Sequence, residues 1–364
     1  MTDTTRTPSA TEPPVLQPTT RLAGLRPYRP PVVPPHVDLR LDANEGPTPP
    51  DPTLSAISST EGSAARAYPS ARDLEHALAA RIGVDPDEVV ATCGGDDAID
   101  RLCRATIEPG RELLLHAPTF EMIERGGRLA GGTIRGVPWM DGPFPIAAML
   151  DAIGPATGMV ALVSPNNPTG GLIPRDAIDA IATRAREFAA VVLLDQAYIE
   201  FAGGEPGPSP SPNLVRVRTF SKARGLAGMR VGYAVAPEPI ATWLRTAGGP
   251  FPVSAAGLRA ALASLDHGDA QHAWIERVRR ERSELAALVA RLGGVAFESH
   301  ANFVLCRFAD AARTHAGLLE RGISVRRFDG RPGLHDCLRI TLPGEPASFE
   351  RLRDALGAIP GATP

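Results

Sequence analysis

Short, uninterrupted apolar runs are the clearest pattern along this chain. Met159–Val163 and Val191–Leu194 contain no polar residue, and Leu113–Leu115 is a shorter run of the same kind. A strand covered by helices on both faces shows such a run, because neither face meets water. Together with a further short strand at 88–92, these runs predict a mostly parallel sheet of buried strands.

Apolar residues at helical spacing mark the regions outside these runs. Leu74, Leu78 and Ile82 recur at i, i+4 and i+8, which predicts one helix, and a long amphipathic helix over 275–292 ends at Gly293-Gly294. Beyond it, short strands alternate with helices, as in a small α+β domain. We expect strands at 295–298, 303–307, 323–327 and 337–342, and helices around 309–320 and 346–357.

Composition is that of a globular protein with two domains. The 364 residues are 43% hydrophobic and 22% charged, with a formal net charge of −3, so neither nucleic acid nor a membrane surface is an expected partner. The four cysteines show no metal-binding spacing, and the polar start shows no signal-peptide pattern, so we expect a cytoplasmic protein with reduced thiols. Residues 1–36 are rich in Thr, Pro and Ser and predict an arm that is either flexible or held along the surface.

Lys222 is the only lysine, since the other 37 of the 38 basic residues are arginine. Arginine replaces lysine as a positive charge, but not as an amine that must lose its proton and attack a carbonyl. A single lysine in such a chain is therefore a candidate for amine chemistry, against the alternative of a surface charge left by coding bias.

The residues around Lys222 predict a strand, a tight turn and a helix. In 214–219 two valines alternate with two arginines, a period of two that predicts an edge strand. Thr219, Ser221 and Arg230 supply two hydroxyls and a guanidinium, which suit a phosphate dianion. A lysine beside a phosphate site suggests a phosphorylated carbonyl cofactor, pyridoxal phosphate.

The run 218–233, Arg-Thr-Phe-Ser-Lys-Ala-x-Gly-Leu-Ala-Gly-x-Arg-Val-Gly-Tyr, resembles the histidinol-phosphate aminotransferase branch of the class I/II (fold type I) pyridoxal-phosphate aminotransferases. The resemblance extends over about 38–358. It implies an α/β fold: a three-layer large domain with a mostly parallel sheet, and a small α+β C-terminal domain. We expect these domains at 37–255 and 256–364, after the arm.

The resemblance also assigns residues to the cofactor. Asn167, in Ser-Pro-Asn-Asn-Pro-Thr-Gly-Gly, and Tyr198 are expected to donate to its phenolic oxygen. Asp195 follows four apolar residues, where a carboxylate needs a partner, and the pyridine nitrogen would be that partner. Catalysis is assigned to Lys222, Asp195 and Tyr198.

Further cofactor contacts are expected around the phosphate and the ring. Gly95 and Asp96 open a helix whose free amides would bind the phosphate, and Phe120 would stack on the ring where the family usually has tyrosine. Tyr68 matches a tyrosine that reaches the phosphate of the neighbouring subunit, which implies a homodimer with shared active sites.

Substrate contacts are expected at three residues. Asn44 lies in Leu-Asp-Ala-Asn-Glu-Gly-Pro, which resembles the family's run over the pocket. Arg339 matches an arginine that takes the substrate carboxylate, and Arg326 would help to bind an anionic tail such as a phosphate.

The function expected from these residues is transamination between an amino substrate, such as histidinol phosphate or a related amine, and an oxo acid. A pyridoxal-phosphate decarboxylase of the threonine-phosphate type, or a specialised-metabolism enzyme, stays open because Phe120, Gln196 and Arg224 depart from the family's usual residues. A regulatory cofactor-binding protein is disfavoured, since no DNA-binding extension is recognisable.

Overall fold

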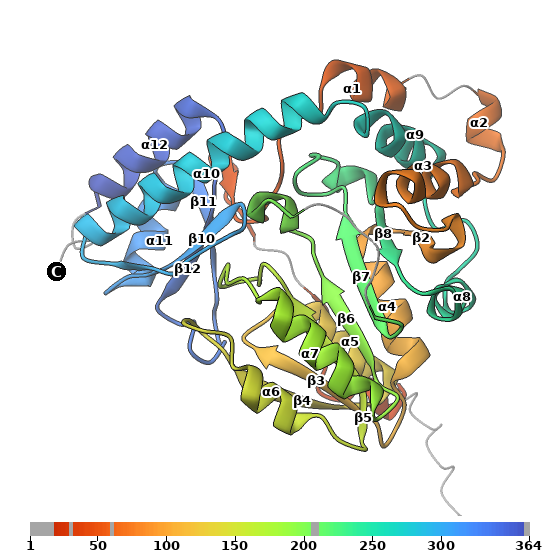
Figure 1. The fold of residues 1–364 in the computed structure, drawn as a ribbon. Coiled ribbons are helices and arrows are strands. Elements are labelled where there is room, and N and C mark those ends of the chain that lie inside the picture. The colour runs from red at the N-terminus through yellow and green to blue at the C-terminus, as the bar shows by residue number, and fades with distance from the viewer. Residues whose placement is uncertain (1–17, 29–31, 59–61, 205–210, 360–364) are drawn as a thin grey trace, which may run out of the picture.

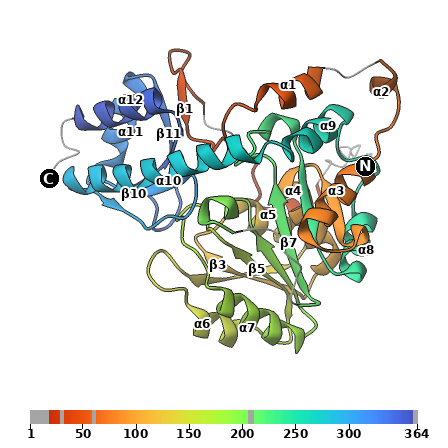
Figure 2. The ribbon, with the colours of Figure 1, turned by 45° about the horizontal axis from the view of Figure 1, so that its top comes forward.

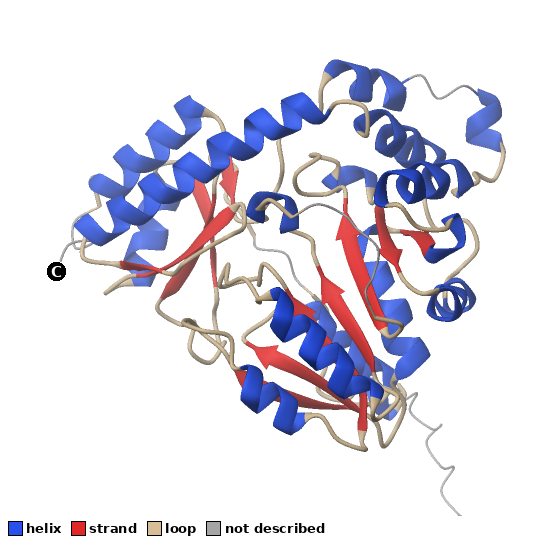
Figure 3. Cartoon of the chain, in the orientation of Figure 1, coloured by secondary structure: helices blue, strands red, loops and turns tan. Residues whose placement is uncertain are grey.

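The computed structural model describes residues 18–28, 32–58, 62–204 and 211–359. Over these residues the larger of two sheets has seven strands in the order β2-β8-β7-β6-β5-β3-β4 (Figures 1 and 3). Its strands are β2 (Val89–Thr92), β3 (Glu112–Ala117), β4 (Thr133–Pro138), β5 (Thr157–Val163), β6 (Val191–Asp195), β7 (Leu214–Thr219) and β8 (Gly232–Val235).

Most of this sheet is parallel, as predicted. β4, β3, β5, β6 and β7 run parallel to their neighbours, whereas β8 is antiparallel to β7 and β2. The carboxyl ends of β5, β6 and β7 therefore meet at one edge, and the chain leaves this edge toward Asn167, Tyr198 and Lys222.

Helices cover both faces of the larger sheet and form three layers. One face packs on α4 (Gly94–Thr106), α5 (Glu121–Ala130) and α8 (Glu238–Ala247), around buried residues such as Leu102 and Leu193. The other face packs on α6 (Ile146–Ala152) and α7 (Arg175–Arg186), around Met149 and Leu162. Burial on both faces explains why these strands contain so few polar residues.

Two expectations about this sheet were wrong. The sequence predicted a helix after the Lys222 turn, but the chain forms only a 3-10 turn over Ala227–Met229 and then the strand β8. The alternation of valine and arginine over 214–219 predicted an edge strand, but β7 lies between β8 and β6. The guanidinium of Arg218 is only 4% exposed and is compensated inside the protein, because it lies 3.8 Å from the Glu200 carboxylate and 3.4 Å from the Gln196 side-chain oxygen. The Arg218 side chain is thus covered by residues of the segment that follows the neighbouring strand β6.

The smaller sheet, as far as the chain is described, has five strands in the order β1-β11-β12-β10-β9. They are β1 (Leu39–Leu41), β9 (Val295–Ala296), β10 (Phe303–Arg307), β11 (Ile323–Arg327) and β12 (Cys337–Thr341), packed against α10 (Gly268–Arg291), α11 (Ala311–Glu320) and α12 (Pro346–Gly357). These elements confirm the C-terminal strands and helices that the sequence predicts, and the long helix as well.

β1 is the one strand of this sheet that comes from the N-terminal part of the chain. It pairs in parallel with β11, with Leu39 opposite Ile323, and Figure 2 shows the two side by side. The division into 37–255 and 256–364 stays a prediction. On the pairing of β1 we propose that 39–41 belong structurally with the smaller domain.

The remaining elements frame the two sheets. They are α1 (Asp51–Ser58), α2 (Gly62–Arg66), α3 (Arg72–Ile82), α9 (Ala255–Ser264) and four short 3-10 turns, η1 (Thr20–Leu22), η2 (Pro86–Glu88), η3 (Ile199–Ala202) and η4 (Ala227–Met229). Of the expected arm, 1–17 and 29–31 lie outside the described residues. The rest touches the body, since the Arg125 guanidinium on α5 donates to the Arg26 carbonyl oxygen over 2.7 Å. No helix in the described ranges is long and apolar enough to span a membrane.

Candidate active site

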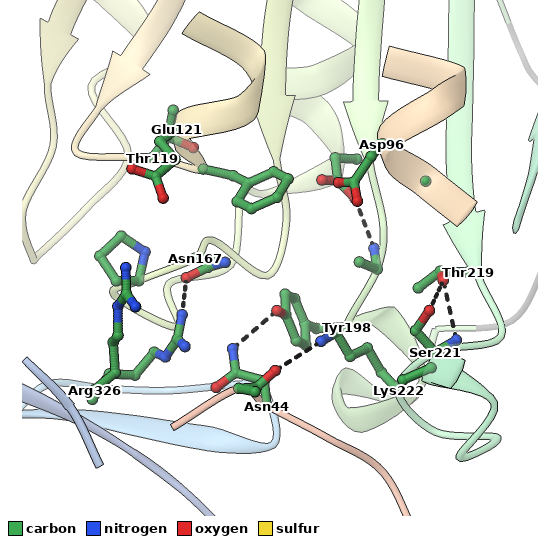
Figure 4. A pocket seen from close by; sticks show the side chains of 18 of the residues that line it. Asn44, Asp96, Thr119, Glu121, Asn167, Tyr198, Thr219, Ser221, Lys222 and Arg326 are labelled. Atoms are coloured by element: carbon green, nitrogen blue, oxygen red, sulfur yellow. Dashed lines mark hydrogen bonds between the residues drawn. The ribbon is translucent and has the colours of Figure 1, made fainter. Parts of the chain in front are cut away.

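A cavity of about 290 Å³ lies at the carboxyl ends of β5, β6 and β7, facing the smaller sheet. Its lining brings together every site residue expected from the sequence except Tyr68 (Figure 4). These residues are Asn44, Gly95, Asp96, Phe120, Asn167, Asp195, Tyr198, Thr219, Ser221, Lys222, Arg230, Arg326 and Arg339. Segments separated by nearly 300 residues thus contribute to one pocket.

Lys222 is half-buried in the turn after β7, and its amine points into the pocket (Figure 4). Its Nζ donates to the Ala43 carbonyl oxygen over 3.1 Å and lies 5.8 Å from the centre of the Tyr198 ring. Burial, helped by the nearby Arg339 guanidinium, lowers the pKa of Lys222 to about 8. The uncharged amine that a nucleophile requires is therefore a minor form at neutral pH and becomes the main form above about pH 8.

The loop that precedes α1 is packed directly on the Lys222 turn, with glycine at both points of closest approach. A Cβ on Gly46 would lie 1.8 Å from the Lys222 carbonyl oxygen, and one on Gly225 would lie 1.9 Å from the Pro47 carbonyl oxygen. Gly225 also has φ +67°, which side chains rarely tolerate. No other residue fits either position, so the two segments are fixed against each other.

Asp195 is the last residue of β6 and is 5% exposed. Its Oδ1 accepts from the Ala197 amide over 2.9 Å, and no ion pair to it is found among the described residues. Burial raises the pKa of Asp195 to about 7. The carboxylate thus lacks a cationic partner at the position where the sequence predicts a pyridine nitrogen.

The expected phosphate site is built from the start of α4 and the end of β7. Thr219 Oγ1 donates to Ser221 Oγ over 2.8 Å, and the Ser221 amide donates to Thr219 Oγ1 over 3.0 Å. Arg230 Nη2 donates to the Asp96 carboxylate over 3.1 Å. A Cβ on Gly94 would lie 2.6 Å from the same Arg230 Nη2, so glycine lets the guanidinium approach the helix start.

Asn44 is buried at 1% exposure, with a φ of +54° that asparagine tolerates better than most residues. Its Nδ2 donates to the Tyr198 hydroxyl over 3.0 Å, and its Oδ1 accepts from Thr341 Oγ1 over 3.0 Å. The backbone amide of Asn44 donates to Thr341 Oγ1 over 3.1 Å. Burial raises the pKa of Tyr198 to about 12, so its hydroxyl keeps its proton at neutral pH.

Arg339 on β12 is 7% exposed and reaches across to the larger sheet. Its Nη1 donates to Asn167 Oδ1 over 2.6 Å, and its Nη2 donates to the Asp42 carbonyl oxygen over 2.8 Å. Burial lowers the pKa of Arg339 to about 10, which leaves it cationic at neutral pH. A buried, planar cation of this kind suits a carboxylate.

The lining also contains residues that were not expected from the sequence, among them Tyr28, Glu121 and Arg331. Glu121 opens α5 directly after Phe120 and forms an ion pair with Arg331 on the β11–β12 loop. Arg326 lines the same region. Of these three residues, only Glu121 could have been found from the sequence, because it lies directly after Phe120, which was expected in the pocket.

Tyr68 lies outside this pocket, with 82% of its surface exposed. Its ring stacks on the Phe251 ring with centroids 4.6 Å apart, in a separate small hollow near α3. A role for Tyr68 within its own chain's pocket has no support in this arrangement. Its expected role in a neighbouring subunit stays a prediction.

Comparisons with known proteins agree with this geometry. The chain is 36% identical to the histidinol-phosphate aminotransferase of Roseiflexus castenholzii, over 93% of this chain and 96% of the relative. Its fold matches the crystal structure of histidinol-phosphate aminotransferase from Sinorhizobium meliloti in complex with pyridoxal-5'-phosphate, with a TM-score of 0.83, 27% identity and coverage of 94% and 96%.

A second solved structure of the same fold is an enzyme of different substrate specificity. It is the aspartate aminotransferase from Thermus thermophilus with maleate, with a TM-score of 0.73, 25% identity and coverage of 88% of this chain and 92% of the other. The family model for aminotransferase class I and II matches residues 37–356. The chain therefore belongs to the aminotransferase class I and II family.

Proposed function

We propose that this enzyme is a pyridoxal-phosphate-dependent aminotransferase that moves an amino group between histidinol phosphate, or a closely related amine, and an oxo acid. The observation that carries the proposal is the position of Lys222. The chain's single lysine, with its pKa lowered to about 8, lies in the same pocket as the Asp195 carboxylate and the hydroxyls of Thr219 and Ser221.

The residues present fit the cofactor at two separate points. The buried Asp195 carboxyl group, which accepts from the Ala197 amide and forms no ion pair with any described residue, suits the protonated nitrogen of a pyridine ring. Thr219, Ser221, Arg230 and the free amides at the start of α4 suit a phosphate. Asp96 already occupies one guanidinium nitrogen of Arg230, so a phosphate would share that cation with a carboxylate.

When bound, the cofactor supplies an aldehyde carbon for amines and a ring that accepts electrons from the substrate α-carbon. The protein supplies the proton chemistry. Lys222 Nζ is the base that takes the proton from the α-carbon and returns it during transfer. Asp195 holds a proton at the ring nitrogen, while Asn167 and Tyr198 are placed to donate to the phenolic oxygen.

Substrate orientation is assigned to the smaller domain. Arg339 donates one hydrogen bond from each Nη atom to the protein and keeps a second N–H on each, which suits the carboxylate of an amino or oxo acid such as glutamate or its oxo acid. Arg326, at the mouth, suits the anionic tail of a phosphorylated amine. Asn44 lines the same wall, although its side chain is committed to Tyr198 and Thr341.

Transamination is supported over the decarboxylase alternative by the family and by the names of the relatives. Phe120 keeps an aromatic face at the pocket, and the Gln196 side chain accepts from Arg218, away from Asp195. Neither departure removes a group on which the proposed chemistry depends. The four cysteines are all unpaired, which supports a cytoplasmic location.

We further propose a homodimer with shared active sites. Tyr68 and Phe251 form an exposed aromatic pair, 82% and 53% exposed, which is the kind of surface that a second subunit covers. Tyr68 would reach the phosphate site of the partner. Two-fold dimers are also the commonest oligomers of globular proteins.

The decisive experiment mixes the purified holoenzyme with single amines in the absence of an acceptor. Histidinol phosphate should abolish the visible absorbance of the cofactor and yield its oxo product without carbon dioxide, and an added oxo acid should restore the absorbance. Threonine phosphate is the control for the alternative. Carbon dioxide released from it, with no response to histidinol phosphate, would refute the proposed activity.

A further inference from the structure

Tyr198 is held in the pocket by packing on its ring and by one donor on its hydroxyl. The ring is 4% exposed and meets the Phe303 ring edge-on at 5.1 Å between centroids. The hydroxyl accepts from Asn44 Nδ2 over 3.0 Å. Packing therefore fixes the Tyr198 ring. The direction in which the Tyr198 hydroxyl donates its proton depends on the position of Asn44 Nδ2, because that group donates to the hydroxyl oxygen.

Asn44 is itself held by two side chains from the other end of the chain. Asn302 Nδ2 donates to the Asn44 carbonyl oxygen over 3.3 Å, and Thr341 binds both the side chain and the backbone amide. The Thr341 hydroxyl donates to Asn44 Oδ1 and accepts from the Asn44 amide, over 3.0 and 3.1 Å. This reciprocal pair uses both the side chain and the backbone of Asn44. The pair orients the Asn44 side chain and, together with Asn302, supports the left-handed φ of +54°.

Thr341 does not line the pocket; it is 3% exposed and lies behind Asn44. It is the last residue of β12, two residues after Arg339, so both side chains project from the same face of the strand. One strand of the smaller domain thus carries the proposed substrate cation and the residue that fixes Asn44.

We propose that Thr341 is a positioning residue which, through Asn44, aims the hydroxyl of Tyr198 at the cofactor's phenolic oxygen. A donor on the Tyr198 oxygen leaves its proton directed away from Asn44 and into the pocket. Thr341 and Arg339 both belong to β12. Any shift of the smaller domain that moves Arg339 therefore also moves the Thr341 hydroxyl, which makes both hydrogen bonds to Asn44. Only the direction of the hydroxyl toward the cofactor rests on the proposed function; the three hydrogen bonds do not.

The first test needs no cofactor. The full-length chain has four tyrosines, so fluorotyrosine labelling gives few ¹⁹F resonances, and Tyr198→Phe identifies the one from Tyr198. In cofactor-free protein, Thr341→Val should shift that resonance, because the hydroxyl loses its fixed donor. Thr341→Ser keeps the hydroxyl at position 341 and should therefore leave the Tyr198 resonance unshifted.

The matched control is Thr314→Val. Thr314 is as buried as Thr341, at 1% exposure, but its hydroxyl donates to the Asp310 carbonyl oxygen within α11, away from the pocket. This variant should leave the Tyr198 resonance unchanged. An unchanged resonance in folded Thr341→Val, or an equal shift in Thr314→Val, would overturn the proposal. If Thr341→Val does not fold, Asn44→Gly decides in its place. Glycine tolerates a φ of +54° and lacks the side-chain amide that donates to the Tyr198 hydroxyl.

The second test uses the holoenzyme and the pH midpoint of its visible absorbance. A hydroxyl that donates to the phenolic oxygen stabilises its deprotonated form, so Thr341→Val should raise the midpoint by roughly half to one pH unit. In a Tyr198→Phe background the same change should have no further effect, since the hydroxyl is absent. An equal shift in that background would show that Thr341 acts by another route.

The two tests separate this proposal from the proposed function. If the protein binds no pyridoxal phosphate, the proposed function fails, and the cofactor-free resonance still decides on Thr341. If the holoenzyme transaminates normally but the resonance does not respond to Thr341→Val or Asn44→Gly, the function stands and the positioning role is refuted.

Discussion

Burial moves the pKa values of the pocket's two central charges toward each other. It lowers the pKa of Lys222 to about 8 and raises that of Asp195 to about 7, because each group has lost water without gaining a close ion-pair partner. A carbonyl for the amine and a protonated ring nitrogen for the carboxylate would satisfy both. The pocket thus places an amine and a carboxyl group whose proton affinities suit the proposed cofactor.

The shifted amine can be measured directly. In cofactor-free protein, acylation of Lys222 should rise with pH through a midpoint near 8, not near the ordinary 10.5, because only the uncharged amine reacts. Mass spectrometry of the Lys222 peptide gives the rate at each pH and separates it from the N-terminal amine. A midpoint near 10.5 would show that burial does not tune this lysine.

Asp195→Asn tests the carboxylate. The amide cannot hold a proton at the ring nitrogen, so kcat should fall by roughly two to four orders of magnitude while some cofactor stays bound. Absorbance reports the cofactor content and steady-state kinetics the turnover. Asp100→Asn is the control, since Asp100 pairs with Arg104 on the exposed side of α4. Near-normal turnover in Asp195→Asn would assign Asp195 another role.

At the scale of elements, α10 carries a buried acid outside the active site. Glu281 is 6% exposed, and its Oε2 accepts from the Gly344 amide over 2.8 Å, just beyond β12. Burial raises the pKa of Glu281 from 4.5 to about 7. The native state therefore keeps the proton more tightly than the unfolded chain, so this group makes stability fall as pH rises from about 4.5 to about 7.

Glu281→Gln should remove that dependence. The variant should match the parent near pH 4.5 and exceed its Tm by a few degrees at pH 8, because the amide stays neutral and its oxygen still accepts from Gly344. Thermal unfolding at both pH values measures the difference. Glu284→Gln, more exposed on the same helix, should show no such gain. A lower Tm for Glu281→Gln at pH 8 would contradict the raised pKa.

Elements with a strong local pattern could be predicted from the sequence, and those defined by distant partners could not. The buried runs of β5 and β6 and the helical spacing of α10 are local properties. β1 has only three residues, and its partner β11 lies at the other end of the chain. Likewise, the sequence pattern predicts that Arg218 faces solvent, whereas in the folded protein it is buried beside Glu200.

The site followed the same rule. Asn167, Asp195 and Lys222 were predicted because the runs around them resemble the family's motifs, and the structure brings all three into one pocket, at or just beyond the ends of β5, β6 and β7. Arg331 and Tyr28 sit in segments without a pattern and reach the pocket only through the tertiary fold. The hydrogen bonds of Thr341 to Asn44 join residues almost 300 positions apart, which no local pattern encodes.

At the scale of the whole molecule, the exposed Tyr68 leads to a prediction about assembly. Lys222→Ala chains and Tyr68→Phe chains should each be weak, because one lacks the amine and the other lacks the hydroxyl it would give to its partner. After subunit exchange, a mixed dimer has one site with both defects and one with neither. Activity above both parents is therefore expected.

Subunit exchange must be shown independently, for example by native mass spectrometry of differently tagged chains. A damaging Tyr68→Phe that shows no rescue despite proven exchange would place Tyr68 in its own chain's chemistry. The wild-type protein, measured at the same total concentration, sets the scale of full activity.

The pairing of β1 with β11 also dictates an order of events during synthesis. The larger sheet ends with β8 at Val235 and can form while the ribosome is still translating the rest, but Leu39 cannot meet Ile323 until that residue has emerged. Thr341 emerges later still, and only then can Asn44 be held. A nascent chain that stops before β12 has Lys222 and Asp195 in place on the larger sheet, with the opposite wall of the pocket unbuilt.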